Sequence, residues 1–286
     1  MAPLKLPCKI LGAPKGAPYL VTLAGFPDDE MSGFKHLLWE FSSSHRIIAC
    51  CFPGFESGGA KKLPKWGYDL ETLREAMHET LASVAEEEGQ FTFNLVIHDW
   101  GSVLGLMYAN KYPERVDSIV CFDVGIMRKP PLKSVIVILF YQMWFCTSYA
   151  TALISRWLGQ FLLMFFFIVL SPLVGPAPYD TLHRGLQEVD VRMCYPYIQF
   201  YFGKRGYFRV GPKKMARPRF PSGIPVCFLF GRKKNTMFHT DDFLSQLDET
   251  PGCRWKSYDA GHWLQEGEHK DEIVGEMRDF MKLKSK

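Results

Sequence analysis

One segment constrains the fold of this chain more than any other: residues 91–106, with the sequence FTFNLVIHDWGSVLGL. Its first half alternates apolar side chains from Phe91 to Ile97, which predicts a buried strand. Its second half is rich in small residues, which allow a helix to pack closely on that strand. Asp99 lies at the junction. This is the layout of a nucleophile elbow, where a tight strand-to-helix turn makes one side chain, here a carboxylate, project above the sheet.

Asp99 also has a purely structural explanation. An aspartate at the start of a helix is most often an N-cap, whose side chain accepts hydrogen bonds from the first backbone N–H groups of the helix. The strand and helix on either side of Asp99 favour the nucleophile, and so do its candidate partners further along the chain.

Residues 97–101, IHDWG, resemble the elbow of α/β-hydrolases of the epoxide hydrolase and haloalkane dehalogenase branch. The resemblance implies an α/β-hydrolase fold, with a mostly parallel central sheet, helices on both faces and an inserted helical cap. It also implies that Asp99 is the nucleophile. The chain departs from the family pattern at Ile97, where a glycine is usual.

The segments outside the elbow fit the same fold. Helical periodicity predicts helices at residues 34–41, with Trp39 buried, and at residues 70–87. Apolar runs predict further strands at residues 19–23, 45–52, 117–123, 224–231 and 255–258. We therefore expect a hydrolase core made of residues 1–125 and 224–286, interrupted by a hydrophobic helical cap at residues 126–223.

A candidate oxyanion hole follows the first of these strands. Residues 24–27, Ala-Gly-Phe-Pro, stand where the resembled family has His-Gly-Phe-Pro. The donors in such a site are backbone N–H groups, so Ala24 in place of the histidine does not remove them. The resemblance implies the N–H groups of Phe26 and Trp100 as the donors, whereas a plain turn at the strand end is the structural alternative.

The general base is expected at His262. It follows the last predicted strand in the segment Gly261-His262-Trp263, and the resembled family places its base in such a Gly-His-aromatic segment. A histidine beyond the last strand, on the carboxyl edge of the sheet, would lie beside the elbow.

The triad acid is less clear from the sequence. In most of the family an aspartate follows the glycine of the strand at 224–231 by three residues, and this chain has Lys234 there. Either Asp123, which ends the strand at 117–123, supplies the acid, or Asp99 and His262 form a dyad. The first alternative keeps the chain order of nucleophile, acid and base.

The predicted cap is unusually apolar. Residues 134–155 and 157–179 contain no charged side chain, and Arg156 separates them. Each stretch is long enough to cross a bilayer as a helix. We favour an apolar cap over a buried substrate tunnel, keep a cap whose outer face docks on a membrane as the second interpretation, and regard spanning helices as the least favoured.

Three tyrosines of the cap are candidate proton donors. In the resembled epoxide hydrolases, two cap phenols donate to the oxirane oxygen. Tyr195 and Tyr197 flank Pro196, and Tyr141 lies in the first cap helix. Simple packing is the alternative explanation for each of them.

Composition argues against several other functions. The net charge is only +4, and the basic run at residues 213–219 has no aromatic side chains interleaved for base stacking, so nucleic acid is not an expected partner. We expect no cofactor and no metal ion. Eight cysteines, mostly within apolar runs, suggest a reducing compartment. No secretory signal is evident, and residues 282–286 resemble a dilysine-type retrieval signal, so we expect a cytoplasmic protein or one on the cytosolic face of an internal membrane such as the endoplasmic reticulum.

A carboxylate nucleophile restricts the reaction. Attack on an ordinary acyl carbon would give an anhydride, whereas displacement at an sp3 carbon bearing oxygen or halogen gives an ester. We therefore predict that the chain opens a lipophilic epoxide through an aspartyl ester and hydrolyses the ester to a diol. The alternatives are a haloalkane dehalogenase or another α/β-hydrolase activity, and a weakly catalytic or non-catalytic protein that binds lipid, membrane or a partner through its cap.

Overall fold

The computed structural model describes residues 3–57, 63–171, 188–204, 206–208 and 218–282. Its centre is a seven-stranded sheet with the strand order β1-β3-β2-β4-β5-β6-β7. β1 is antiparallel to β3, and the other neighbouring strands are parallel. The strands are β1 (Cys8–Gly12), β2 (Tyr19–Leu23), β3 (Arg46–Cys50), β4 (Phe93–His98), β5 (Val116–Phe122), β6 (Val226–Gly231) and β7 (Arg254–Tyr258).

Helices cover both faces of the sheet, because successive strand residues point to opposite sides. In β4, for example, Val96 packs against α1 (Lys35–Phe41) and α9 (Lys270–Lys282), whereas Leu95 and Ile97 pack against the other face. That other face carries α2 (Leu70–Glu88), α3 (Trp100–Lys111) and α8 (Asp241–Glu249). The predicted mostly parallel central sheet with helices on both faces is thereby confirmed.

One local expectation for the core is wrong. Trp39 is 78% exposed, whereas Leu37, Leu38 and Phe41 of the same helix are buried. The helix has only seven residues, so its single buried stripe is filled by these three side chains and leaves Trp39 on the solvent side.

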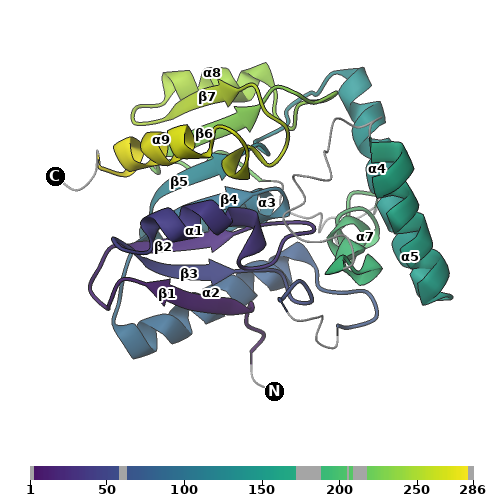
Figure 1. Cartoon of the computed structure of the whole chain (residues 1–286), viewed down its shortest axis with the longest axis horizontal. Helices are drawn as coiled ribbons and strands as arrows, with labels where there is room; N and C mark the ends of the chain where they lie inside the picture. The colour runs from purple at the N-terminus through teal and green to yellow at the C-terminus, as the bar shows by residue number, and fades with distance from the viewer. Residues whose placement is uncertain (1–2, 58–62, 172–187, 205, 209–217, 283–286) are drawn as a thin grey trace.

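A helical insertion separates β5 from β6. Its helices are α4 (Leu132–Ala152), α5 (Arg156–Phe165), the π-helical turn Phe166–Leu170, the 3-10 turn Val191–Cys194 and α7 (Tyr195–Phe202). Figure 1 shows α4, α5 and α7 together on the right of the view, beside the sheet, whereas α9 lies on the left. The division of the chain at residues 125 and 223 stays a prediction, and parts of the predicted cap lie outside the described residues.

Candidate active site

Asp99 occupies a strained strand-to-helix turn between β4 and α3. Its backbone has φ 54° and ψ −127°, a conformation that non-glycine residues rarely adopt. The following helix packs very closely on β2, because a Cβ atom added to Gly101 would lie 1.9 Å from the carbonyl oxygen of Leu23. Within the described part of the chain, the Asp99 side chain makes no cap hydrogen bond to α3. The turn is therefore an elbow that presents a carboxylate, and the N-cap alternative is not supported.

Ile97 is accommodated by a glycine on the facing helix. A Cβ atom at Gly105 would lie 2.5 Å from Cγ2 of Ile97, so the bulk of the isoleucine fills the space that a side chain on α3 would occupy. The departure of Ile97 from the family pattern thus leaves the elbow geometry intact.

The carboxylate of Asp99 lies in the predicted oxyanion hole. The backbone N–H of Phe26 donates to Oδ1 of Asp99 at 2.7 Å. Gly25 makes this approach possible, because a Cβ atom there would lie 2.3 Å from both Asp99 Oδ1 and the amide nitrogen of Trp100. The N–H of Phe26 therefore contacts one oxygen of the carboxylate directly, and the amide nitrogen of Trp100 lies beside Gly25 in the same corner of the site.

His262 faces the second oxygen of Asp99. Its Nε2 lies 3.5 Å from Asp99 Oδ2, and its Nδ1 lies 2.5 Å from Oδ2 of Asp123. Burial on its own lowers the pKa of His262, but the charge and hydrogen bond of Asp123, together with those of Asp99, outweigh it and raise the pKa to about 9. The imidazole of the resting site is therefore protonated at neutral pH.

Asp123 is brought to His262 by the end of β5. It is fully buried, has φ 62°, and accepts a hydrogen bond from the N–H of Gly231 at 3.1 Å. Burial acts to raise its pKa, but the charges of Lys234 and His262 act more strongly in the opposite direction and hold the pKa of Asp123 well below its usual range. Asp99, His262 and Asp123 thus have the geometry of a triad, which favours the first of the two alternatives that the sequence left open.

A cavity of about 110 Å³ opens beside these residues. Core residues form one wall and aromatic side chains of the insertion form the other. Asp99, Lys234 and His262 supply its charged groups. The remaining lining residues are Phe26, Pro27, Phe238 and Trp263 from the core, and Tyr141, Phe145, Phe166, Phe167, Ser171 and Tyr197 from the insertion.

The fold agrees with comparisons to known proteins. The family model for the α/β-hydrolase fold matches residues 33–175, half of the chain. The chain belongs to the α/β-hydrolase family. Cis-3-alkyl-4-alkyloxetan-2-one decarboxylase from Shewanella oneidensis is 23% identical over 256 residues, which cover 87% of this hydrolase and 77% of the relative.

Epoxide hydrolases also occur among the similar proteins. Epoxide hydrolase 4 from Homo sapiens is 29% identical over 141 residues, which cover 46% of this hydrolase and 37% of that protein. A crystal structure of Bacillus megaterium epoxide hydrolase with an inhibitor has a TM-score of 0.67 at 20% identity, covers 97% of this hydrolase and 96% of that chain, and shows a common fold. These relatives support placing the hydrolase in the epoxide hydrolase-like branch, as its elbow motif implied.

Two of the three candidate phenols lie in the cavity of this hydrolase. Tyr197 contacts the indole ring of Trp100 edge-on, with ring centroids 5.0 Å apart, and the side-chain amide of Gln142 donates to the hydroxyl oxygen of Tyr141 at 2.9 Å. Burial, followed by the charge of Asp99, raises the pKa of both phenols, so each keeps its proton and can donate it.

Tyr195 is not brought to the cavity, so we withdraw it as a candidate proton donor. Its ring packs against Gly67 and lies edge-on to Phe55, with the Phe55 and Tyr195 centroids 6.0 Å apart. Its hydroxyl is buried and has no hydrogen-bond partner among the described residues. Tyr195 and Tyr197 are two positions apart on a helix, so they point in different directions, and only Tyr197 faces Asp99.

Sequence reasoning did not find three further polar residues around the triad. Lys234, noted only as a missing acid, pairs with Asp123. The Nε2 atom of His98 lies 3.0 Å from the backbone oxygen of His262. Burial lowers the pKa of His98 to about 3, so its imidazole is neutral and donates a hydrogen bond to that oxygen. Asp28 accepts a hydrogen bond at 2.8 Å from the indole N–H of Trp263. The available signals were the histidine inside the elbow motif and an aspartate two residues after Phe26.

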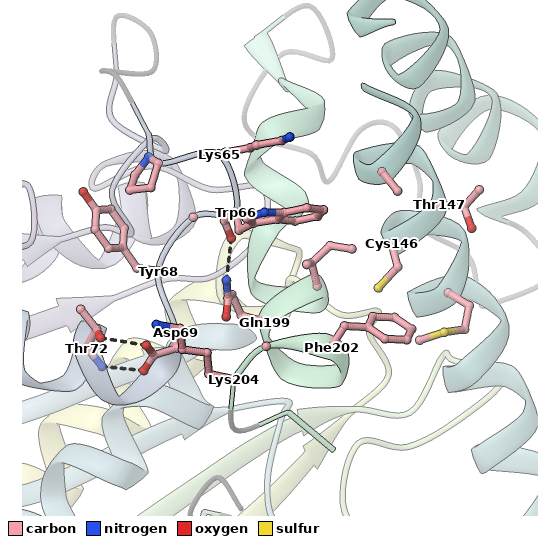
Figure 2. Close-up of a pocket in the computed structure, with 16 residues that line it drawn as sticks. Lys65, Trp66, Tyr68, Asp69, Thr72, Cys146, Thr147, Gln199, Phe202 and Lys204 are labelled. Atoms are coloured by element: carbon pink, nitrogen blue, oxygen red, sulfur yellow. Dashed lines mark hydrogen bonds between the residues drawn. The ribbon is translucent and has the colours of Figure 1, made fainter. Parts of the chain in front are cut away.

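A larger groove of about 810 Å³ lies on the other side of α4 and α7. Figure 2 shows it between the loop that carries Lys65, Trp66 and Tyr68 and the helix that carries Cys146 and Thr147. None of the triad residues lines this groove. The smaller cavity beside Asp99 is therefore the candidate active site.

Proposed function

We propose that this protein is an epoxide hydrolase that acts through a covalent ester of Asp99. One observation carries the proposal: the two oxygens of a projecting aspartate have different partners, a backbone N–H at 2.7 Å on Oδ1 and an imidazole at 3.5 Å from Oδ2. An aspartate that caps a helix does not need a histidine base and an oxyanion hole.

In the first half-reaction, Oδ2 of Asp99 attacks a carbon of the epoxide and the bond from that carbon to the ring oxygen breaks. A phenol in the cavity, Tyr197 or Tyr141, gives its proton to the departing oxygen. The products are a hydroxyalkyl ester on Asp99 and a phenolate. The N–H of Phe26 holds Oδ1 and so fixes which oxygen attacks.

In the second half-reaction, the protonated His262 first gives its proton to the phenolate, because Asp99 is now a neutral ester. Nε2 of His262 then takes a proton from a water molecule while the water oxygen bonds to Cγ of Asp99. Negative charge develops on Oδ1, between the N–H groups of Phe26 and Trp100. The ester bond breaks, the diol oxygen takes the proton from His262, and the new carboxyl group gives its own proton to His262, which restores the anionic Asp99 and the protonated imidazole of the resting site. Asp123 keeps His262 oriented and stabilises its charged form.

The cavity lining supports a lipophilic substrate. Phe26, Phe145, Phe166 and Phe167 surround the position that the substituents of the ring would occupy. Transfer of alkyl or aryl surface from water to such a lining is favourable by about 25 cal/mol per Å2.

Single-turnover labelling in H2(18)O tests this mechanism. With enzyme in excess over a lipophilic epoxide, the label should appear in the carboxylate of Asp99 and be detected by mass spectrometry of the proteolytic peptide. Label in the diol of the first turnover, with none in Asp99, would refute the ester. The Asp99→Asn variant should form neither diol nor labelled peptide. Halide release from a long haloalkane in place of epoxide turnover would instead identify a dehalogenase, and no turnover would favour a binding protein.

A strained lactone is the second candidate substrate. The relative aligned over 87% of the chain is named as a decarboxylase of 3-alkyl-4-alkyloxetan-2-ones, whose ring carries alkyl groups on sp3 carbons. Such a carbon is also open to attack by a carboxylate. Release of CO2 from a dialkyl oxetanone, with no diol formed from epoxides, would favour this activity.

We also propose that the outer face of α4 and α5 docks on a membrane. Ile154, Trp157 and Leu132 are 92%, 76% and 74% exposed. The other large exposed apolar side chains of α4, α5 and the π-helical turn that follows are Ile136, Phe140, Leu158, Phe161, Ile168 and Val169. We call these nine residues together the apolar face. Monomeric soluble proteins rarely expose large apolar patches, so this number of exposed apolar side chains on consecutive helices favours contact with lipid.

Charge and burial favour docking over spanning. Residues 124–155 contain Arg128, Lys129 and Lys133 and no carboxylate, which complements an anionic lipid surface. By length and composition α4 could cross a bilayer, and 28% of its most apolar window is buried. Its buried side chains include Tyr141 and Phe145, which line the catalytic cavity, so withdrawal of α4 into a bilayer would open the active site.

Co-sedimentation with vesicles tests the docking. Phosphatidylcholine vesicles containing phosphatidylserine should bind the full chain more tightly than phosphatidylcholine alone, and Trp157→Gln with Ile154→Gln should weaken binding at least about tenfold. Equal binding of the wild type and this double variant to the vesicles would refute the docking. Such contact suits a cytoplasmic protein or one on the cytosolic face of the endoplasmic reticulum. Residues 283–286 of the dilysine-type end that suggested this compartment lie outside the described residues.

A further inference from the structure

Lys234 is a buried cation in direct contact with the triad acid. It follows β6, its side chain is 4% exposed, and its ammonium group pairs with Oδ1 of Asp123. The other oxygen of Asp123, Oδ2, lies 2.5 Å from Nδ1 of His262. Asp123 therefore lies between two cationic groups, and each of its oxygens contacts a different one.

The proposed reaction changes the charge of this cluster. In the resting site Asp99 and Asp123 are anionic and His262 and Lys234 are cationic, so the four charges sum to zero. Alkylation converts Asp99 to a neutral ester, and His262 has to be neutral to accept a proton from water. The charges then again sum to zero, because Lys234 still balances Asp123.

Without Lys234 the ester intermediate with a neutral His262 would be unfavourable. Asp123 would be the only charge left near the imidazole in the ester intermediate, and an opposite charge within about 4–6 Å favours the protonated form of a histidine by about 1–3 pKa units. The base would then stay protonated at neutral pH and the ester would persist.

We propose that Lys234 is a positioning residue that neutralises Asp123, so that His262 can give up its proton and act as a base once Asp99 carries the substrate. The catalytic role of Lys234 in this inference rests on the proposed ester mechanism. Its effect on the pKa of His262 does not depend on that mechanism, because it involves only residues of this chain.

The other ionisable groups around His262 do not replace Lys234. His98, at the end of β4, and His239, between β6 and α8, are neutral because burial lowers their pKa values to about 3 and about 4. Asp28 on the β2 side is an acid. Tyr141 and Tyr197 of the insertion keep their protons. Lys234 is thus the cation that contacts Asp123 among the described residues, apart from His262 itself.

Titration of His262 tests the electrostatic part without any substrate. Asp99→Asn imitates the uncharged ester state, and NMR of histidine-labelled protein, assigned with His262→Gln, reports the pKa of His262. Adding Lys234→Met to Asp99→Asn should raise this pKa by at least about one unit. Adding Asp123→Asn as well should lower it again. An unchanged pKa on loss of Lys234 would overturn the proposal.

A kinetic measurement then separates this proposal from the mechanism on which it rests. In Lys234→Met with Asp99 intact, formation of the ester should be little changed, whereas its hydrolysis should slow at least about tenfold at pH 7 and recover as the pH rises. Equal loss at every pH would indicate a merely structural role and overturn the inference. If the wild type forms no ester while the NMR titration shows the expected pKa shift, the epoxide mechanism is wrong, but the effect of Lys234 on the pKa of His262 is supported. Lys234→Gln, which keeps a polar group, repeats both measurements if the methionine variant does not fold.

Discussion

The two walls of the catalytic cavity are built on different physical principles. The core wall supplies the charged groups, Asp99, His262 and Lys234, at the ends of strands or in the turns that follow them. The insertion wall supplies phenyl and phenol rings and Ser171. One wall depends on directional contacts at fixed distances, and the other on apolar area.

This difference separates chemistry from substrate choice. Charged groups that must meet a reacting atom have to be held within fractions of an ångström, which strand ends can do because the sheet fixes them. Apolar rings tolerate substitution of similar volume, since their contribution scales with buried area. Changes in the core wall should therefore abolish turnover, and changes in the insertion should adjust its rate, its substrate range or its location.

The largest effect is expected for the core base. His262→Gln should lower turnover of a lipophilic epoxide by about 10³-fold or more, because it removes the group that activates water. Alkylation of Asp99 does not need this base, so the ester should accumulate. Intact-protein mass spectrometry after mixing with the epoxide should show an adduct of the mass of the substrate. Asp99→Asn is the control that gives no adduct. Turnover of His262→Gln near that of the wild type would show that His262 is not the base.

A smaller loss is expected when the oxyanion hole is displaced. The Cβ atom of Gly25→Ala would meet Asp99 Oδ1 and the amide of Trp100 at 2.3 Å, so the backbone that carries the N–H of Phe26 must move. Misplacing one such donor costs about 10²–10³ in turnover. Gly275→Ala in α9, where nothing lies within 4 Å, is the matched control and should leave turnover unchanged. Equal activity of the two variants would show that the hole does not take part.

The fold of the core could be predicted from the sequence because its signals are local. The alternation in residues 91–97 and the small residues after Asp99 are each sufficient to indicate a strand or a closely packed helix. Trp39 was missed for the same reason: a helical pattern gives the period of the buried stripe, but in a seven-residue helix it does not fix which large side chain falls outside it.

The site could be predicted in part. Asp99, His262 and Phe26 lie in motifs and were found, whereas Lys234 was read only as the loss of an acid. Its pairing with Asp123 joins residues 111 positions apart, and no local pattern reports such a contact. The choice between Tyr195 and Tyr197 depends on the rotation of α7 about its axis, which the sequence around Pro196 leaves open.

That choice gives the third test, which concerns the insertion. Tyr197→Phe should lower the rate of ester formation by about 10- to 100-fold, because a proton donor to the departing oxygen is lost while Tyr141 remains. Tyr195→Phe should have no effect on this rate, since its ring lies against Phe55 and Gly67. Rapid mixing with a chromogenic epoxide measures the step. A loss in Tyr195→Phe equal to that in Tyr197→Phe would show that the phenols act through the fold and not through the substrate.

The smallest effect is expected on the apolar face of the insertion. Trp157→Gln should change the free energy of unfolding by less than about 0.5 kcal/mol, because the ring is 76% exposed and little of its area is withdrawn from water on folding. Phe145→Ala, at a side chain that is 3% exposed, should cost about 3–5 kcal/mol in the same denaturant titration. If the two costs were similar, the face would be a covered part of the core. If Trp157 contributes nothing to the stability of the fold, burial of its ring can still contribute to binding. The surface that buries it then lies outside the folded chain, as a membrane does.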